Sequence, residues 1–326
     1  MQGNGQTRQT ILGANGTIGT PLAAELRTYT DTIRLVSRNP RRVNPTDELL
    51  PLDLSRPADM AANVEKAVAG SAIVYLMTGF DYSLSVWKAT WPPLMAAVIA
   101  ACIRHKSKLV FFDNVYMYDK DAIPRMTEAS PLNPPSKKGA VRKQIAEMLM
   151  EATRTRGLQA LIARSADFYG PDNGKSLITE VIIKNQLKGK KANWMMDAGK
   201  RHSLTYTPDA AKATAMLGNA EDTYGQVWHL PTDPAALTGR ELAALAAKEM
   251  GAPEGVALFP IWMMKILGLF MSIMRELPEM MYQYDRDYIF DCSKFNKRFR
   301  FQTTTYAEGI KSTAAAALKA AKASET

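Results

Sequence analysis

Cysteine and histidine are scarce in this chain. Its 326 residues include two cysteines, Cys102 and Cys292, and three histidines, His105, His202 and His229, all of them isolated in the sequence. This isolation argues against a disulfide framework and against a metal site, since neither has ligands or partners at the required spacing. It also predicts a reducing compartment, so we expect a cytoplasmic protein without a bound metal.

Acidic residues are outnumbered as well. The chain has 41 Lys and Arg against 32 Asp and Glu, which gives a net charge of +9. The basic residues are spread out and form no repeat with aromatic residues, so the balance favours attraction to small anions, and we expect no nucleic-acid partner. The length and the 46% hydrophobic content allow one large or two modest domains with a full core.

No apolar run is long and uninterrupted enough for a comfortable membrane span. The nearest is Leu258–Met274, which is rich in Met, Ile, Leu and Trp but is interrupted by Lys265 and followed by Arg275. We predict a buried or pocket-lining helix there, because flexible thioethers conform to varied ligands. Contact of its apolar face with a membrane surface is the alternative, and no integral span is expected.

The sequence does contain a glycine-rich turn directly after its first apolar strand. Gly13, Gly16 and Gly19 stand three residues apart, before an amphipathic run. The first permits a tight turn, the second lets the backbone approach a pyrophosphate, and the third lets the helix pack closely, with the phosphates at its N-terminus. The pattern is Gly-x-x-Gly-x-x-Gly rather than the commoner Gly-x-Gly-x-x-Gly. The predicted cofactor contacts are these glycines and the intervening Asn15, Thr17 and Ile18.

The second predicted strand indicates which dinucleotide is preferred. It covers residues 33–36 and ends in Ser37 and Arg38, with Arg41 and Arg42 close behind. An acidic residue at this end would bind the 2′-hydroxyl of NAD, whereas a hydroxyl and a guanidinium suit a 2′-phosphate. We therefore predict NADP(H) in preference to NAD(H), with a solvated basic loop as the alternative.

The third predicted strand, around residues 50–52, is followed by Asp53 and Leu54, which we expect beside the adenine. Further along, apolar runs at 72–77, 108–112 and 158–163 alternate with helical patterns at 91–103 and 137–153. This alternation predicts an α/β fold, a Rossmann-type doubly wound parallel sheet with a smaller C-terminal substrate domain. We expect a dinucleotide-binding domain over residues 1–170, to which 203–212 return, and a mainly substrate-binding domain over 171–326.

Five segments together carry a resemblance to a known family. They are Gly13–Gly19, the strand 109–112 with residues 113–118, the proline-rich 127–134, the segment 164–171 and residues 206–211. In this order they resemble the extended short-chain dehydrogenase/reductases, the NAD-dependent epimerase/dehydratase group. The resemblance covers nearly the whole chain and implies an NAD(P)-binding enzyme of small molecules. It leaves open the substrate, the direction of reaction and whether the chain forms a homodimer.

The chain departs from that family at a central position. The resemblance implies a Tyr-x-x-x-Lys pair on one helix face, whose Lys lowers the phenol's pKa from about 10. If Glu147 aligns with the acidic residue that often follows the motif, Lys143 takes the Lys position and Gly139 stands where Tyr should be. A one-residue slip instead pairs Lys138 with Arg142. Neither register contains a phenol, so the family's proton donor is missing.

Other side chains are candidates for the lost role. Asn114 occupies the place of the family's Ser or Thr, and Tyr116 is the phenol expected to reach the cleft, with Tyr118, Tyr169 and Tyr206 as rivals. The predicted catalytic residues are Asn114, Tyr116 and Lys143, and Arg142 or Lys143 is expected on the cofactor. The predicted substrate contacts are Asp167, Tyr169, His202 and Tyr206. Packed aromatic side chains and a solvated helix face are the structural alternatives.

These observations predict an NADP(H)-dependent oxidoreductase or epimerase-like enzyme with an atypical active site. Its expected substrate is a small, partly apolar carbonyl or hydroxyl compound. A non-catalytic NADP(H)-sensing protein that retains the cofactor cradle is one alternative, and a nucleotide-sugar epimerase or dehydratase is another. The missing Tyr favours the sensor, whereas the motifs in the second half of the chain favour an enzyme.

Overall fold

The computed structural model describes residues 7–171, 173–174, 176 and 178–325, and the chain divides into two compact units. Unit 1 comprises residues up to 117, 137–164 and 210–228, and unit 2 comprises 118–136, 165–209 and 229–326. The expected division into residues 1–170, to which 203–212 return, and residues 171–326 stays a prediction beside this division by contacts. The chain passes between the units several times, because the later segments 137–164 and 210–228 supply helices and strands to the first unit.

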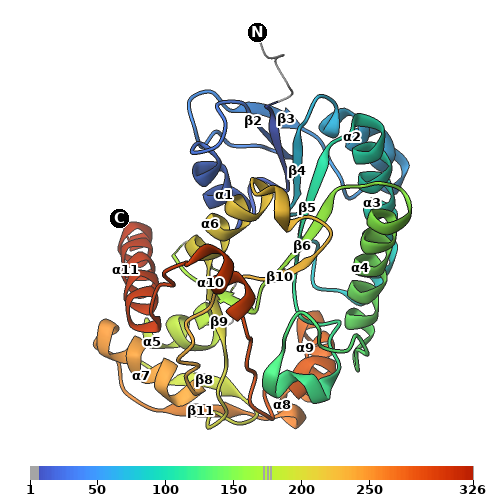
Figure 1. The fold of residues 1–326 in the computed structure, drawn as a ribbon. Helices are drawn as coiled ribbons and strands as arrows, with labels where there is room; N and C mark the ends of the chain where they lie inside the picture. The colour runs from blue at the N-terminus through green and yellow to red at the C-terminus, as the bar shows by residue number, and fades with distance from the viewer. Residues whose placement is uncertain (1–6, 172, 175, 177, 326) are drawn as a thin grey trace. The chain divides into compact units, whose positions relative to one another are not determined.

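Unit 1 is built around a seven-stranded sheet in the order β10-β6-β5-β4-β1-β2-β3 (Figure 1). The strands are β1 (Gln9–Leu12), β2 (Ile33–Ser37), β3 (Glu48–Pro51), β4 (Ile73–Leu76), β5 (Lys108–Asp113), β6 (Ala160–Arg164) and β10 (Val227–His229). The five pairs from β6 to β3 are parallel. Strands β1, β4 and β6 are buried along their whole length, as expected for parallel strands covered on both faces. The predicted α/β fold is confirmed.

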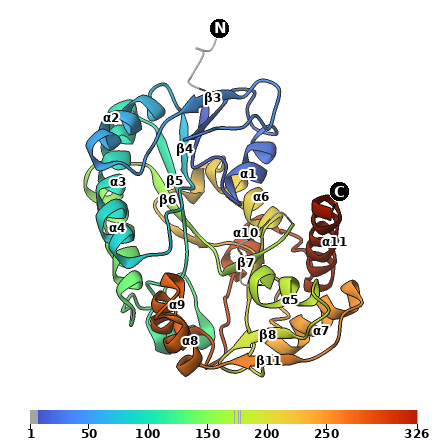
Figure 2. The ribbon, with the colours of Figure 1, turned by 180° about the vertical axis from the view of Figure 1, so that it is seen from behind.

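Helices cover both faces of this sheet. On one face lie α2 (Pro57–Val68), α3 (Leu84–His105) and α4 (Lys137–Thr155), and on the other lie α1 (Gly19–Leu26) and α6 (Thr207–Gly218) (Figures 1 and 2). By length and composition alone, α3 is apolar enough to cross a membrane. It packs between α2 and α4, and half of its most apolar window is buried, which is typical of a core helix.

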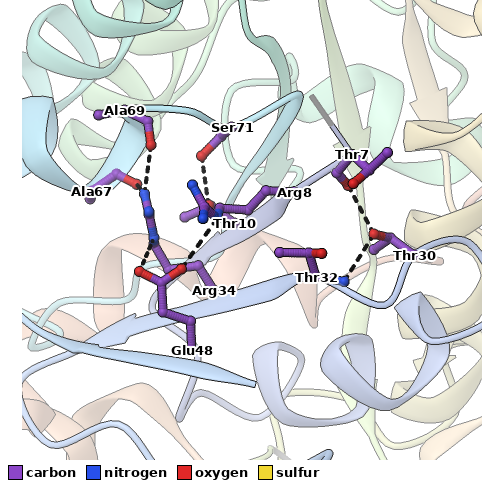
Figure 3. A network of polar contacts seen from close by, with 10 residues as sticks. All are labelled: Thr7, Arg8, Thr10, Thr30, Thr32, Arg34, Glu48, Ala67, Ala69 and Ser71. Atoms are coloured by element: carbon purple, nitrogen blue, oxygen red, sulfur yellow. Dashed lines mark hydrogen bonds and ion pairs between the residues drawn. The ribbon is translucent and has the colours of Figure 1, made fainter. Parts of the chain in front are cut away.

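A polar network closes the edge of the sheet where the strands begin (Figure 3). Arg34 in β2 donates from Nη1 to the carbonyl oxygens of Ala67 and Ala69, both at 2.8 Å, and from Nε to Glu48 at 3.0 Å. Arg8 Nε lies 3.2 Å from the other carboxylate oxygen of Glu48. The buried guanidinium of Arg34 thus ties β2, β3 and the end of α2 together.

Unit 2 contains two short parallel strand pairs and several helices. The pairs are β7 (Asp167–Tyr169) with β9 (Leu204–Tyr206), and β8 (Ala192–Met195) with β11 (Val256–Phe259). The helices are α5 (Lys184–Gln186), α7 (Gly239–Met250), α8 (Ile261–Leu267), α9 (Ser272–Glu276), α10 (Ser293–Phe299) and α11 (Tyr306–Glu325). Short 3₁₀ turns cover Lys120–Arg125 and Pro278–Gln283, and a π-helical turn covers Thr179–Ile183. In unit 1, a further 3₁₀ turn covers Glu221–Thr223.

The segment that returns to the main sheet differs from the predicted one. Residues 203–212 were expected to return there, but β9 within them pairs with β7 and runs directly into α6. The chain reaches the sheet only after that helix, where the Ile162 amide of β6 donates to the Gln226 carbonyl at 3.1 Å. A helix must lead the chain back before a strand can join such a sheet, which is why β10 and not β9 takes the edge.

The apolar segment 258–274 also departs from its prediction as a buried or pocket-lining helix. It folds as α8, a turn and α9. Met264 is buried in the core of unit 2, but Trp262 and Phe270 are exposed. Only one face of α8 packs against the core of unit 2, so the large apolar side chains on the opposite face remain in solvent.

Candidate functional site

The first glycine of the cradle occupies a conformation that other residues rarely adopt. Gly13 has φ +91°, and a Cβ atom built on it would lie 2.8 Å from the backbone of Thr78, which follows β4. The amide N–H of Gly13 donates to the Val36 carbonyl at 2.9 Å. The turn therefore fits between two neighbouring strands, and only glycine fills it without strain.

The other two glycines differ in what surrounds them. A Cβ on Gly19 would lie 2.7 Å from the Gly13 carbonyl oxygen, so α1 begins directly against the end of β1. Gly16 is exposed, and its Cβ would approach that same oxygen at 3.2 Å. Helix α1 has no side-chain cap at its N-terminus and no acidic residue in its first turn. Its first N–H groups thus suit a phosphate.

The remaining cradle residues lie as follows. Asn15 donates from Nδ2 to the Asn39 carbonyl at 2.5 Å and accepts from the Arg41 amide at 3.2 Å, so it holds the loop after β2 against the cradle. Thr17 is partly exposed, whereas Ile18 is buried, so a cofactor would meet Ile18 through its backbone.

The end of β2 carries an unsatisfied hydroxyl. Ser37 Oγ is buried and makes no hydrogen bond within the described part of the chain. The neighbouring Arg38 is exposed. Arg42, by contrast, donates to the carbonyl oxygens of Pro45 and Asp47, at 2.7 and 2.8 Å, and so serves the loop itself. A buried hydroxyl without a partner, beside an exposed guanidinium, fits a ligand oxygen.

The end of β3 holds the predicted adenine contacts. Hydrogen bonds from the Ser55 hydroxyl and amide lower the pKa of Asp53, and Arg38 lowers it further. Leu54 is buried in the core of unit 1. The carboxylate of Asp53 is therefore ionised and near Arg38. An open cradle and an orphaned hydroxyl together fit a dinucleotide.

A buried ion pair lies at the end of β5. Oδ1 of Asp113 accepts hydrogen bonds from Arg142 Nε at 2.8 Å, from Arg142 Nη2 and from the Asn114 amide at 2.9 Å. Oδ2 of Asp113 lies 3.7 Å from Nε of Arg164, its register partner on β6. Two guanidinium groups thus neutralise one buried carboxylate where the strands end.

Aromatic rings surround this pair. The guanidinium of Arg142 lies 4.4 Å from the centre of the Trp91 ring, 5.1 Å from Phe111 and 5.8 Å from Trp87. Such contacts stabilise a cation that has left water. Arg142 therefore positions Asp113 and the end of β5, and its predicted contact with the cofactor stays a prediction.

Asn114 and Tyr116 come just after Asp113 in the chain. Oδ1 of Asn114 accepts from the Tyr116 amide at 3.0 Å, which leaves the side-chain N–H₂ group of Asn114 as the donor that makes no hydrogen bond to the described residues. The ring of Tyr116 stacks on Trp87, with centroids 6.2 Å apart and planes 14° apart. Both side chains are partly exposed at the carboxyl edge of the sheet. This is the edge at which open α/β sheets bind ligands.

The burial of the side chains along α4 distinguishes the two possible alignments of the Tyr-x-x-x-Lys motif. Lys138 is fully buried with Nζ 4.8 Å over the Tyr82 ring, and the equally buried Arg142 follows one turn later. Lys143 is 36% exposed and lies 3.8 Å from Glu147 on the outer side. The register that pairs Lys138 with Arg142 is therefore the one that faces the interior of unit 1.

Within unit 2, two of the predicted substrate residues contact each other. Nε2 of the buried His202 lies 3.0 Å from Oδ2 of Asp167, which also accepts from the Tyr284 hydroxyl at 2.8 Å. The imidazole is stacked between Tyr284 and Tyr288, with centroids 4.9 and 4.2 Å away. The side chain of Asp167 remains partly open to solvent. A histidine, a carboxylate and a phenol are thus held rigidly together.

The other two predicted substrate residues form a separate aromatic group. Tyr169 is buried with its ring 5.4 Å from Tyr206, and burial raises the pKa of its phenol well above the usual range. A Cβ on Gly309 would lie 2.4 Å from the Tyr169 hydroxyl. Tyr169 is therefore packed as a core residue, whereas Tyr206 is partly exposed.

Sequence reasoning missed some of these residues. Arg164 and Lys138 received no role, and Tyr284 lay in an unassigned stretch. A charged residue closing each of two adjacent apolar strands, as Asp113 and Arg164 do, was a usable signal, because parallel strands end at the same edge. Among the described residues, no group of three His, Cys, Asp or Glu side chains could hold a metal ion.

Comparisons with known proteins agree with this geometry. A model of the NAD dependent epimerase/dehydratase family matches residues 10–229. No curated protein matches the sequence. Among solved structures, UDP-glucose 4-epimerase from Thermus thermophilus, in complex with NAD, is similar, with a TM-score of 0.76, 17% identity and 96% and 99% of the two chains covered.

Two further structures are similar to the chain. The dTDP-glucose 4,6-dehydratase from Streptomyces venezuelae, with NAD and TYD bound, has a TM-score of 0.77 and 18% identity, and covers 96% of this chain and 97% of its own. An epimerase from Methanothermobacter thermautotrophicus has a TM-score of 0.80 and 11% identity, over 97% and 94%. At these identities the likeness concerns the fold.

Proposed function

The chain belongs to the NAD-dependent epimerase/dehydratase family of enzymes, and from this premise we propose an NADP(H)-dependent oxidoreductase or epimerase-like enzyme. Its proposed substrate is a small, partly apolar compound with a carbonyl or hydroxyl group. One observation carries the cofactor choice, namely the buried and unpartnered Ser37 Oγ next to the exposed Arg38. Together they offer a 2′-phosphate a hydroxyl and a guanidinium at the position where an acidic residue would favour NAD.

The cofactor, when bound, supplies or accepts a hydride. The chain's own residues would act on the substrate oxygen. The side-chain N–H₂ group of Asn114 donates a hydrogen bond to that oxygen, and the Tyr116 hydroxyl exchanges a proton with it. The partly exposed rings of Phe80, Tyr82 and Tyr116 offer apolar surface near the ends of β4 and β5, which supports a partly apolar substrate.

Cofactor titration tests the first part of this proposal. We expect NADPH to bind more tightly than NADH, and Arg38→Ala to narrow the difference by about 1.5–3 kcal/mol, the scale of a charge-assisted hydrogen bond. Arg104→Ala is the matched control, because Arg104 is also exposed but pairs with Glu65 at the far end of α3. Equal affinities of the unmodified protein for NADPH and NADH would contradict the assignment.

Turnover tests the second part. With ketones, aldehydes, enones and UDP-glucose as a panel, Tyr116→Phe should leave NADPH affinity unchanged and lower turnover by about 10²–10⁴, the usual contribution of a positioned general acid. Tyr29→Phe is the control, since this exposed phenol follows the C-terminal end of α1. Lys143→Gln should weaken cofactor binding as well, and an unchanged NADPH affinity would show that this residue on the outer side of α4 does not hold the cofactor. Tight NADPH binding without turnover of any compound would instead support the sensor, and conversion of UDP-glucose alone would support a nucleotide-sugar enzyme.

A further inference from the structure

The exposed apolar surface of unit 2 is concentrated in one short segment. Leu269 is 78% exposed, Phe270 is 83% exposed and Trp262 is 61% exposed, and Leu258, Ile266 and Met271 are also exposed. Scattered exposed apolar residues are ordinary, but six large ones within fourteen residues form a patch that favours contact with another molecule. We call the six residues the α8 patch.

The backbone of α8 gives this patch a defined geometry. Trp262 and Ile266 are one helical turn apart on the exposed face, opposite the buried Met264. Beyond the end of α8, the amides of Leu269 and Phe270 donate to the carbonyl oxygens of Ile266 and Leu267, at 3.1 and 3.0 Å. These bonds continue the turn and hold both side chains at the end of the same face.

The charged residues inside the segment that carries the patch are basic. Acidic residues lie only beside it: the exposed Glu254 precedes β11, Glu276 directly follows Arg275 and is partly buried, and Glu279 belongs to the 3₁₀ turn that packs against α8 and α9. From Val256 to Arg275 the sequence contains two basic residues, Lys265 and Arg275, and no acidic residue. Both are exposed, and a Cβ on Gly268 would lie 3.0 Å from Cγ of Arg275, which places the arginine stem against the patch. An apolar face that combines Trp, Phe and Leu with flanking Lys and Arg has the composition of helices that lie in a membrane interface.

We propose that the α8 patch docks this protein peripherally on a bilayer that contains anionic lipid. Trp262, Leu269 and Phe270 enter the boundary between headgroups and acyl chains, and Lys265 and Arg275 contact the lipid phosphates. A second copy of the chain is a poorer fit, because an ordinary protein interface uses about 20–30 residues from each side, and the patch has six from one segment. The segment is too short to span, so the contact stays at the surface.

The fluorescence of Trp262 reports directly on this contact, because the other four tryptophans are buried. The full-length protein is mixed with vesicles of phosphatidylcholine alone, or of phosphatidylcholine and phosphatidylglycerol in equal amounts. We expect co-sedimentation, a blue shift of the emission and protection from acrylamide only with the anionic vesicles. The protein without lipid should show one acrylamide-accessible tryptophan, which Trp262→Phe removes.

Variants separate the apolar contribution to vesicle binding from the electrostatic one. Leu269→Ser with Phe270→Ser should weaken vesicle binding by about tenfold or more, since each loses the burial of a large apolar side chain. Lys265→Gln and Arg275→Gln should each weaken it by about fivefold and reduce its salt dependence. Tyr29→Ser removes an exposed aromatic residue of unit 1 and should change nothing. Because the substituted side chains are exposed, the melting temperature should not change.

Several results would overturn the proposal. They are the absence of binding to anionic vesicles, equal binding to neutral ones, or equal binding by the Leu269→Ser and Phe270→Ser variant. A dimer that these substitutions dissociate, without vesicle binding, would show that the patch pairs two copies. A Trp262 that acrylamide does not reach in the lipid-free monomer would show that the chain itself covers the patch.

Discussion

The polar side chains at the two ends of strand β2 differ in their hydrogen bonding. Near the start of the strand, Arg34 donates three hydrogen bonds, to Ala67, Ala69 and Glu48, although it is buried (Figure 3). At its end, Ser37 Oγ is buried and makes none with the described residues. The same difference separates the closed network at the start of the sheet from the open glycine turn at the end of β1.

The difference follows from the direction of the strands. In a parallel sheet all strands begin at one edge and end at the other, so structural and ligand-binding tasks can be divided between the edges. A buried polar group normally finds a partner, and an orphaned one needs a reason. At the edge where the strands end, the reason that we propose is a bound cofactor. Asp113 and Arg142 show that charge is still neutralised there, through an aromatic-walled ion pair.

The largest effect should come from breaking that ion pair. Arg142→Leu would leave the buried Asp113 with the hydrogen bond from the Asn114 amide and with Arg164 at 3.7 Å, and should lower the free energy of unfolding by about 3–5 kcal/mol. Chemical denaturation measures this.

Arg34→Leu tests the other edge. It should lower the free energy of unfolding by a smaller amount, about 2–3 kcal/mol, because the side chain of its partner Glu48 is 41% exposed and can be solvated by water instead. NADPH affinity should be unchanged in this variant. If Arg34→Leu weakened NADPH binding, the division between the two edges would be wrong.

Substitutions in the glycine turn should separate its contribution to stability from its contribution to cofactor binding. Gly13→Ala should lower the free energy of unfolding by about 1–3 kcal/mol, because the residue has φ +91° and its new Cβ meets the Thr78 backbone. Gly16→Ala should lower the free energy of unfolding by less, at most about 1 kcal/mol, since Gly16 is exposed and its new Cβ meets the Gly13 carbonyl oxygen at 3.2 Å. It should nevertheless weaken NADPH binding by about tenfold, or 1.4 kcal/mol, by holding the pyrophosphate away. Thermal melting and titration compare the two; a stable Gly16→Ala variant with full affinity would contradict the cradle.

The smallest expected effect is that of removing the Ser37 hydroxyl, and its direction is well defined. Ser37→Ala removes a buried hydroxyl without a partner, so the stability of the cofactor-free protein should stay constant or rise by up to about 1 kcal/mol. NADPH affinity should fall by about 1 kcal/mol and NADH affinity should not change. Melting with and without each cofactor measures this. A loss of stability in the cofactor-free protein would show that the hydroxyl has a structural partner.

Local pattern predicted much of the dinucleotide-binding part. The apolar strands β1, β2, β4, β5 and β6, the helix α4 and the glycine turn were all recognisable, because each is set by short-range periodicity and by the lack of a side chain on glycine. The edge strand was misplaced, because β9 and β10 are both short and nothing local tells which sheet a three-residue strand joins. Which face of α4 points inward was likewise undecided, since Lys138, Arg142 and Lys143 are all basic.

The sequence by itself determined the α/β fold, the glycine-rich turn after β1 and the absence of a phenol at Gly139, because these depend on residue identity and on spacing along the chain. Tertiary structure alone decided that Arg142 pairs with Asp113 29 residues away, that Ser37 keeps its hydroxyl unpaired, and that α8 turns Trp262 and Phe270 to solvent. The reason is that burial and hydrogen bonding are properties of neighbours in space. A parallel sheet brings together strand ends that lie far apart in the chain.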